Sequence, residues 1–217
     1  MKIAIPLFDG ITALDAIGPY EVLSRLPGAE VTFVAAEPGP KRTDTRALAL
    51  TADVALTDLP HPEVLVFPGG YGTRALMHDP EMLDWVRGVH SSSQWTTSVC
   101  TGALVLAGAG ILEGLEATTY WLELETLRRY GATPVQGRFV EQGKVITAAG
   151  VSAGIDMALL LASRIACDTV AQAIQLGIEY DPQPPFDAGS PAKAPAEAQA
   201  LVRAAQRAEA EAETVAG

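Results

Sequence analysis

Cysteine, positive charge and long apolar runs are all scarce in this sequence. Two cysteines among 217 residues exclude a framework held together by disulfides. Fifteen Lys and Arg residues stand against 26 Asp and Glu residues, for a net charge of -11. Without a basic tract, such a chain is a poor partner for nucleic-acid phosphates or for an anionic membrane surface. No run of 18 apolar residues is present, which excludes a membrane-spanning helix of ordinary length.

The first ten residues lack the long apolar stretch and the cleavage site of a signal peptide. We therefore expect a cytoplasmic protein with reduced thiols. The three histidines, His61, His78 and His90, stand in or beside loops and helix ends and are expected at the surface. No HExxH or CxxC motif is present, so the sequence predicts neither a metal site nor a hydrolytic Cys-His-Asp triad.

Apolar runs alternate with helical patterns along most of the chain. Strands are expected at 2–8, 31–36, 64–67 and 96–99, with a hairpin at 139–147 that turns at Gln142-Gly143. Helices are expected from Thr12 or Asp15 to Leu26, and at 79–89, 102–109, 122–130, 153–166 and 168–180. Continuous apolar runs are typical of parallel strands covered on both faces. The alternation predicts an α/β fold with a mostly parallel sheet.

The composition changes after Tyr180. Residues 181–191 hold four of the 15 prolines, which excludes a helix or a central strand there. We expect an α/β domain over residues 1–181 and an extension over 182–217 that ends in a helix from 195 to 215. The extension is either a frayed tail or an arm docked on the domain or on a partner subunit, and Phe186 favours docking.

The strongest chemical signal is the junction Ser98-Val99-Cys100-Thr101-Gly102. A strand runs directly into Cys100 and a helix of small residues follows, which is the pattern of a nucleophile elbow. N–H groups at the start of that helix would lower the pKa of the thiol. The alternative is a buried cysteine that packs as a small apolar residue, and this is what we expect of Cys167.

Two other segments also follow strands. Phe67-Pro68-Gly69-Gly70 can turn tightly and aim N–H groups into a cleft; ordinary turn chemistry is the alternative, and the motifs of a phosphate-binding loop are missing. Asp15 lies just past the first strand, at the edge where open α/β sheets carry their sites. Its alternative role is a helix N-cap.

Together these residues resemble the ThiJ/PfpI superfamily, which has the class I glutamine amidotransferase-like fold. The matching stretches are 14–22, 67–70, 98–102, 117–121, 148–156 and 175–191. The resemblance implies a three-layer α/β sandwich with a flavodoxin-like sheet. It implies Cys100 as nucleophile, Asp15 as general acid/base, and backbone N–H groups of Gly70 and Thr101 facing a developing anion, with the Thr101 hydroxyl near the thiolate. Many relatives have His where this chain has Tyr120, which argues against chemistry that uses a triad.

Within the superfamily the chain most resembles members that hydrate isocyanides. The resemblance implies conversion of a small organic isocyanide to an N-substituted formamide through a thioimidate on Cys100. It implies no metal and no organic cofactor, and it implies a homodimer. Enzymes acting on small aldehydes, such as glyoxalases and deglycases, and non-enzymatic stress or sensor proteins share the elbow and remain alternatives. If Asp15 keeps its proton beside Cys100, we expect a coupled pair with Cys100 largely ionised at neutral pH.

Overall fold

The computed structural model describes residues 1–216, with side chains as far as residue 208. The chain divides into two compact units, Met1–Tyr180 and Asp181–Gly217. Each unit is described by itself. In the described residues no helix is long and apolar enough to cross a membrane.

The first unit is built on a seven-stranded sheet with the order β10-β11-β7-β6-β1-β2-β5. Its strands are β1 (Lys2–Pro6), β2 (Glu30–Ala35), β5 (Val54–Ala55), β6 (Val64–Phe67), β7 (Trp95–Val99), β10 (Phe139–Gln142) and β11 (Val145–Ala148). All neighbours pair in parallel except β10 with β11. The five strands β2-β1-β6-β7-β11 have the 2-1-3-4-5 order of a flavodoxin-like sheet, as expected.

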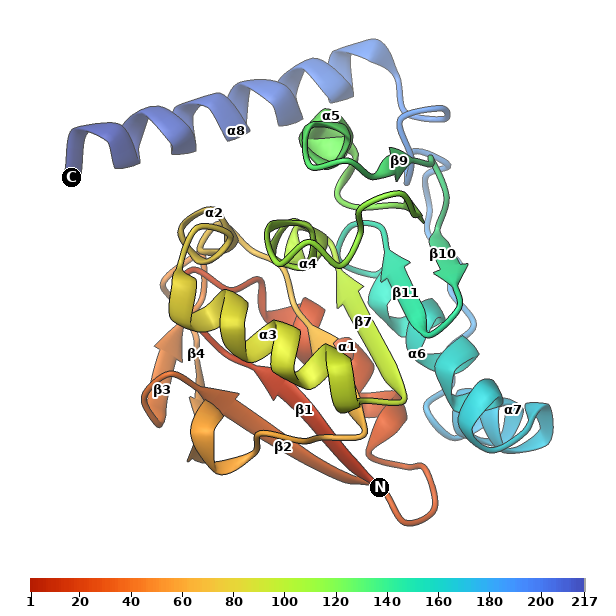
Figure 1. Ribbon diagram of the computed structural model, residues 1–217. Coiled ribbons are helices and arrows are strands. Elements are labelled where there is room, and N and C mark those ends of the chain that lie inside the picture. Colours follow the sequence, from red (N-terminus) through yellow and green to blue (C-terminus); the bar gives the residue numbers. More distant parts are fainter. Residues whose placement is uncertain (217) are drawn as a thin grey trace. The chain divides into compact units, whose positions relative to one another are not determined.

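Helices cover both faces of this sheet (Figure 1). On one face lie α1 (Ala13–Leu23) and α6 (Ala153–Ile165); on the other lie α3 (Pro80–Ser92) and α4 (Gly102–Gly108). The remaining helices of this unit are α2 (Thr73–Leu76), α5 (Leu124–Arg129) and α7 (Asp168–Gly177), with short 3-10 turns η1 (Leu56–Asp58) and η2 (Trp121–Glu123). The three-layer α/β sandwich predicted from the sequence is confirmed.

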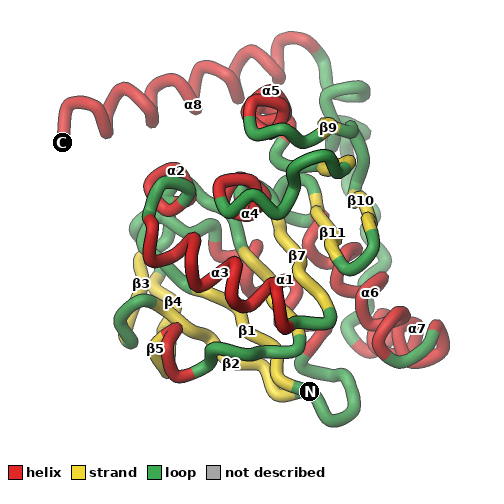
Figure 2. Tube along the Cα trace, in the orientation of Figure 1, coloured by secondary structure: helices red, strands yellow, loops and turns green. Residues whose placement is uncertain are grey.

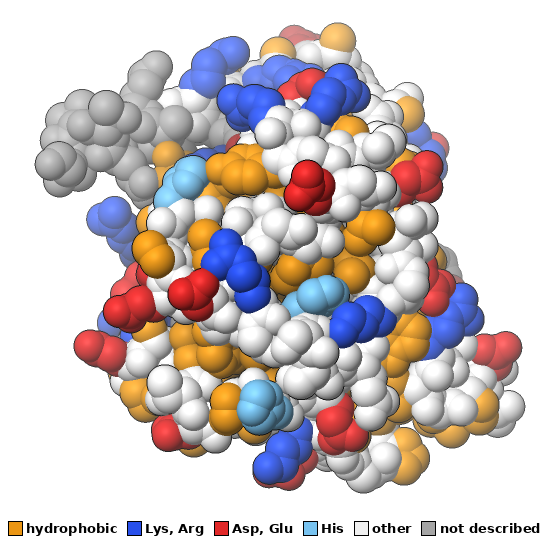
Figure 3. All heavy atoms as spheres, viewed as in Figure 1, with side chains coloured by type: hydrophobic (Ala, Val, Ile, Leu, Met, Phe, Trp, Pro, Cys, Tyr) orange, Lys and Arg blue, Asp and Glu red, His pale blue; other side chains and the backbone are white. Residues whose placement is uncertain are grey.

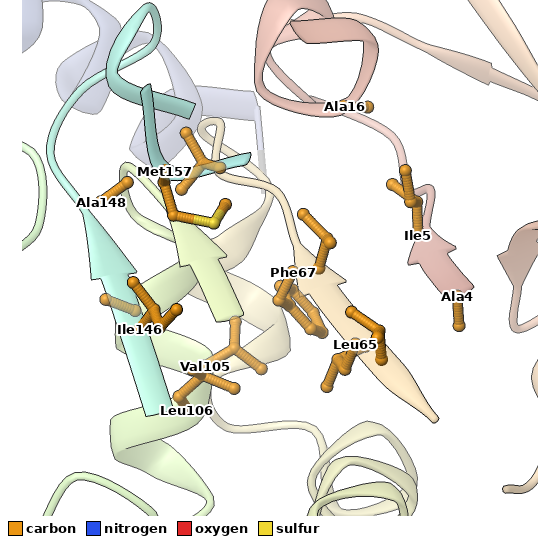
Figure 4. Packing of buried hydrophobic residues seen from close by; sticks show 14 of the residues in the cluster. Ala4, Ile5, Ala16, Leu65, Phe67, Val105, Leu106, Ile146, Ala148 and Met157 are labelled. Atoms are coloured by element: carbon orange, nitrogen blue, oxygen red, sulfur yellow. The ribbon is translucent and has the colours of Figure 1, made fainter. Parts of the chain in front are cut away.

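The core lies between the sheet and its helices because the central strands bury both faces. All four residues of β6 are buried, as a run of Val, Leu and Phe predicts. Phe67, Ile146 and Met157 are labelled among the buried side chains of Figure 4. Helix α3 begins where Asp79 accepts hydrogen bonds from the N–H groups of Glu81 and Met82, which satisfies two of the free donors at a helix start.

Several boundaries differ from the expectations, and several short elements were missed. The antiparallel hairpin of β3 (Gly39–Arg42) and β4 (Ala49–Ala52) was not predicted, because its proline and charged residues do not read as a strand. A short pair of parallel strands, β8 (Glu116–Ala117) and β9 (Thr133–Pro134), was missed too. The β10–β11 hairpin turns at Gly143 and Lys144, one residue later than expected. Helix α7 ends at Gly177 rather than Tyr180.

The second unit begins with a stretch without strands or long helices and ends in α8 (Ala196–Ala216), shown in red in Figure 2. Phe186 is exposed, as are Leu201 and Val202 of α8. On the face of the molecule drawn in Figure 3, acidic and basic side chains are interspersed.

Candidate active site

The loops that follow three adjacent strands meet at one edge of the sheet. Strand β1 leads to Asp15 on α1, β6 leads to Gly69 and Gly70, and β7 leads to Cys100. These strands are neighbours in the order β7-β6-β1. The sequence-predicted residues Cys100, Asp15, Gly70 and Thr101 are therefore brought together. They lie at the carboxyl edge, next to the point between β1 and β6 where the strand order reverses, which is where open α/β sheets bind ligands.

Cys100 occupies the sharp turn between β7 and α4. Its φ is 54°, a left-handed conformation that costs a residue with a side chain on the order of 1–3 kcal/mol. Its N–H donates to the carbonyls of Ala148 and Ala149, at 3.1 and 3.0 Å, and its carbonyl accepts from the hydroxyl of Thr119 at 2.8 Å. Both backbone groups are thus anchored, and the surrounding structure holds the elbow that the sequence predicts.

Asp15 faces the elbow from the first turn of α1. The N-cap of this helix is Thr12, so the alternative role of Asp15 as a cap is wrong. The Asp15 side chain is fully buried, and its Oδ2 accepts a hydrogen bond from the Gly69 N–H at 2.9 Å. Oδ1 receives no N–H or O–H donor from the described residues. The Cys100 side chain is another polar group that acts on the pKa of this carboxyl group.

Gly69 lies between the two reactive side chains. A Cβ atom on Gly69 would stand 2.6 Å from the Thr101 nitrogen, 2.7 Å from Asp15 Oδ2 and 2.8 Å from Cys100 Cβ. No side chain fits in that space. Gly70, the next residue, has a φ of 131°, which only glycine adopts readily. The two glycines therefore do more than form a turn, because they let the loop after β6 approach both Asp15 and Cys100.

Burial governs the proton affinity of Asp15. It raises the pKa of this carboxyl group to about 7; the Gly69 N–H opposes the rise, the charge of Asp44 adds to it, and the hydrogen bond with Cys100 opposes it. A carboxyl group with a pKa near neutrality can both donate and accept a proton at physiological pH.

Burial and the charge of Asp15 raise the pKa of the Cys100 thiol as well. The N–H group of Thr101 at the helix start lowers this pKa as expected, but burial and Asp15 outweigh it. The expectation that Cys100 is largely ionised at neutral pH is therefore wrong. Hydrogen bonds from the N–H groups of Thr101 and Val151, and from the Thr101 hydroxyl, oppose the rise. Because the charge of Asp15 raises the pKa of Cys100, the pair resists a second negative charge.

Val151 is one of the site residues that sequence reasoning missed. It follows β11, and its φ of 42° is strained for a β-branched residue. A backbone N–H carries no sequence signal of its own. The stretch 148–156 resembles the superfamily, but only the folded loop shows that the Val151 N–H reaches the Cys100 sulfur.

The Gly70 N–H has a different partner from the one expected. It donates to Thr101 Oγ1 at 2.9 Å, and the Thr101 hydroxyl is within 3.0 Å of the Gly70 carbonyl. The Thr101 side chain is thereby fixed beside the thiol. In this structure the backbone donors at the sulfur come from Thr101 and Val151.

The other cysteine and the histidines lie away from these contacts. Cys167 is exposed, so the prediction that it is buried is wrong. The reason is that α6 ends at Ile165, and Cys167 is an extended residue just before α7. His61 and His78 are exposed, whereas His90 is half-buried, with Nδ1 2.9 Å from Thr96 Oγ1. Among the described residues no group of His, Cys, Asp and Glu side chains is arranged to hold a metal ion.

Tyr120, which stands where many superfamily members have His, is half-buried beside the elbow. The preceding residue, Thr119, holds the Cys100 carbonyl. The ring carbon Cδ2 of Tyr120 would lie 3.0 Å from a Cβ on Gly150, which begins the turn containing Val151. A tyrosine ring does not supply the imidazole base of a triad.

Fold and site together define a class: a flavodoxin-like α/β protein with a cysteine on a nucleophile elbow and a buried acidic partner. Residues 1–164 match the DJ-1/PfpI family, and the chain belongs to that family.

Individual relatives agree with this assignment. The chain is 42% identical over 194 residues to the isonitrile hydratase of Pseudomonas putida, covering 89% of this chain and 85% of that protein. A crystal structure of a ThiJ/PfpI family protein from Pseudomonas syringae has a TM-score of 0.91 at 35% identity, and the match covers 100% of this chain and 90% of that one. Drosophila melanogaster DJ-1beta, at 22% identity, shares the fold with a TM-score of 0.75 over 82% of this chain and 97% of its own.

Proposed function

We propose that this protein hydrates small organic isonitriles to N-substituted formamides. The observation that carries the proposal is the buried pair of Cys100 and Asp15, whose side chains flank Gly69. The 42% identity to an isonitrile hydratase over 89% of the chain supports it.

The reaction needs one nucleophile and one proton at the same carbon. Sulfur adds to the isonitrile carbon and that carbon takes a proton, so a thiolate beside a protonated carboxyl group supplies both. Two backbone N–H groups, those of Thr101 and Val151, stabilise the Cys100 thiolate, whereas the Asp15 carboxyl has one backbone donor. We assign the single charge in the reactive state to the sulfur and the proton to Asp15.

The remaining steps conserve atoms and charge and need no metal, organic cofactor or redox partner. Cys100 adds to the carbon as Asp15 gives up its proton, which leaves a thioimidate and a carboxylate. Asp15 then takes a proton from water while the oxygen adds to the thioimidate carbon. The proton of the added hydroxyl moves to the nitrogen and the carbon–sulfur bond breaks. The formamide then leaves, with the thiolate and the protonated Asp15 restored.

Purified protein is to be assayed with an alkyl and an aryl isocyanide, with the formyl proton of the product followed by NMR. We expect turnover by wild type and none by Cys100→Ala. Methylglyoxal is the second substrate. Turnover of methylglyoxal with no hydration of either isocyanide would instead support the aldehyde-acting alternative.

We also propose that the protein works in the cytoplasm as a homodimer, with an α/β domain over residues 1–181 and an extension over 182–217. The large apolar side chains exposed on both units support self-association; in the first unit they include Leu48 and Leu176. Sedimentation of the full chain and of residues 1–181 tests this. Unchanged size and unchanged melting in the shorter chain would make the extension an appendage.

A further inference from the structure

We infer that Asp44, in the loop between β3 and β4, is a positioning residue for the reaction at Cys100. It holds in place the segment Ile11–Thr12, which positions Asp15, and it puts a negative charge near the Asp15 carboxyl group. The inference rests on the proposed function for its kinetic part.

The contacts of Asp44 hold Ile11–Thr12 from one side. Asp44 Oδ2 accepts from the Thr12 hydroxyl at 2.6 Å, and the Asp44 N–H donates to the Ile11 carbonyl at 2.9 Å. From the other side, the Thr12 N–H donates to the Gly69 carbonyl at 3.0 Å. Ile11 also forms β-bridges with Thr43 and with Gly70. The segment is therefore held between the β3–β4 hairpin and the glycine loop of the site.

Thr12 connects these contacts to Asp15. Thr12 is the N-cap of α1, yet its side chain makes no hydrogen bond to that helix; its hydroxyl binds Asp44 instead. The Thr12 carbonyl accepts the Asp15 N–H at 3.1 Å. A shift of Thr12 would move Asp15 through this bond and would move Gly69, the donor to the Asp15 side chain, through the Gly69 carbonyl.

The charge of Asp44 acts on the same group. Three groups change the pKa of the Asp15 carboxyl: the Gly69 N–H, the Cys100 side chain and the Asp44 carboxylate. Asp44 raises the pKa of Asp15, so removing its charge must lower that pKa. Because Asp44 is exposed, salt should weaken the effect.

Two variants separate the charge from the contact. Asp44→Asn keeps an oxygen that can accept from Thr12 but removes the charge, whereas Thr12→Val removes the hydroxyl but keeps the charge. Asp53→Asn is the matched control, because Asp53 is an exposed carboxylate just past the opposite end of the same hairpin. All variants carry Cys167→Ala, so that iodoacetamide reports on Cys100 alone. The readouts are kcat/KM for an isocyanide and the rate of alkylation, each against pH at low and high salt.

In Asp44→Asn we expect the midpoint near pH 7 to fall by about 0.3–1 unit in both profiles at low salt, and by less at 1 M salt. In Thr12→Val we expect kcat/KM to fall by about tenfold with little shift of the midpoint. Asp53→Asn should match wild type. A midpoint that moves no more in Asp44→Asn than in Asp53→Asn, or an unchanged kcat/KM in Thr12→Val, would overturn the inference. If no isonitrile turns over, the proposed function fails, and the alkylation profile alone supports or overturns the assignment of Asp44.

Discussion

Cys100 and Cys167 both stand just before a helix, yet their surroundings differ in every respect that sets thiol chemistry. Cys100 is buried, with a φ of 54° and hydrogen bonds at its sulfur from two backbone N–H groups. Cys167 is exposed and extended, and the acidic residue beside it, Asp168, is exposed too. Cys167 is the thiol more accessible to solvent, whereas Cys100 is the thiol held among ordered hydrogen-bond partners. If ordered hydrogen-bonding groups around the sulfur determine which thiol attacks the substrate, the buried Cys100 is the reactive one.

Replacing each cysteine in turn should give the largest contrast. Cys100→Ala is expected to lower turnover of an isocyanide by at least about 10⁴-fold, as removal of a nucleophile does. Cys167→Ala should leave turnover within about twofold and stability within about 0.5 kcal/mol. Formamide production and thermal melting measure both variants. Equal losses in two folded variants would contradict the assignment of Cys100.

The acidic partners differ in the same way. Asp15→Asn keeps an acceptor for the Gly69 N–H but cannot pass a proton, so turnover should fall by about 10²–10⁴-fold. Asp168→Asn, beside the exposed cysteine, should not change turnover. Single-turnover rates for the two variants are the measurement, and an active Asp15→Asn enzyme would rule out Asp15 as the acid.

Gly69 beside Cys100, and Gly177 at the far end of the helix that follows Cys167, provide a steric version of the comparison. Gly69→Ala would place a methyl group within 2.8 Å of Cys100 Cβ and 2.7 Å of Asp15 Oδ2. We expect kcat/KM to fall by about 10²-fold, since small misplacements of reacting groups are costly. Gly177→Ala, at the end of α7, would meet nothing within 4 Å and should be neutral. A fully active Gly69→Ala enzyme would show that the close approach at Gly69 is dispensable.

Asp15 should also lower the free energy of unfolding of the protein as the pH rises. Its pKa is raised in the folded protein to about 7 and is near 3.9 in an unfolded chain. Between these values the folded state binds more protons than the unfolded state, so the free energy of unfolding falls as pH increases. Relative to Asp15→Asn, wild type should lose a few kcal/mol between pH 4 and pH 8. Urea unfolding at the two pH values tests this, with Asp168→Asn as control; a pH-independent difference would contradict the raised pKa.

The organisation of the first unit could be predicted because its signals are local. The apolar run Val64–Phe67 needs two covered faces, and the junction at Cys100 puts a strand directly before small residues. The alternation of such segments was enough to predict the layers, the parallel sheet and the edge at which Asp15, Gly69 and Cys100 meet.

What the sequence could not show depends on contacts between distant segments. The N–H of Val151 reaches the sulfur only because β11 pairs with β7. Asp44 comes near Asp15 only through a hairpin whose strand Gly39–Arg42 has no apolar side chain other than that of Pro40. The exposure of Cys167 follows from a break after Ile165 that an apolar pattern does not reveal. The raised pKa of Cys100 reflects burial, which the helix start alone did not convey.

The most direct test of the account is to identify which cysteine carries the substrate. Enzyme mixed with an alkyl isocyanide is quenched in acid within one turnover and analysed by intact and peptide mass spectrometry. We expect an adduct with the full mass of the isocyanide on the peptide containing Cys100, none on the peptide containing Cys167, and a greatly reduced adduct in Asp15→Asn. Formamide released over the same time course with no adduct on Cys100, or an adduct on Cys167, would contradict it.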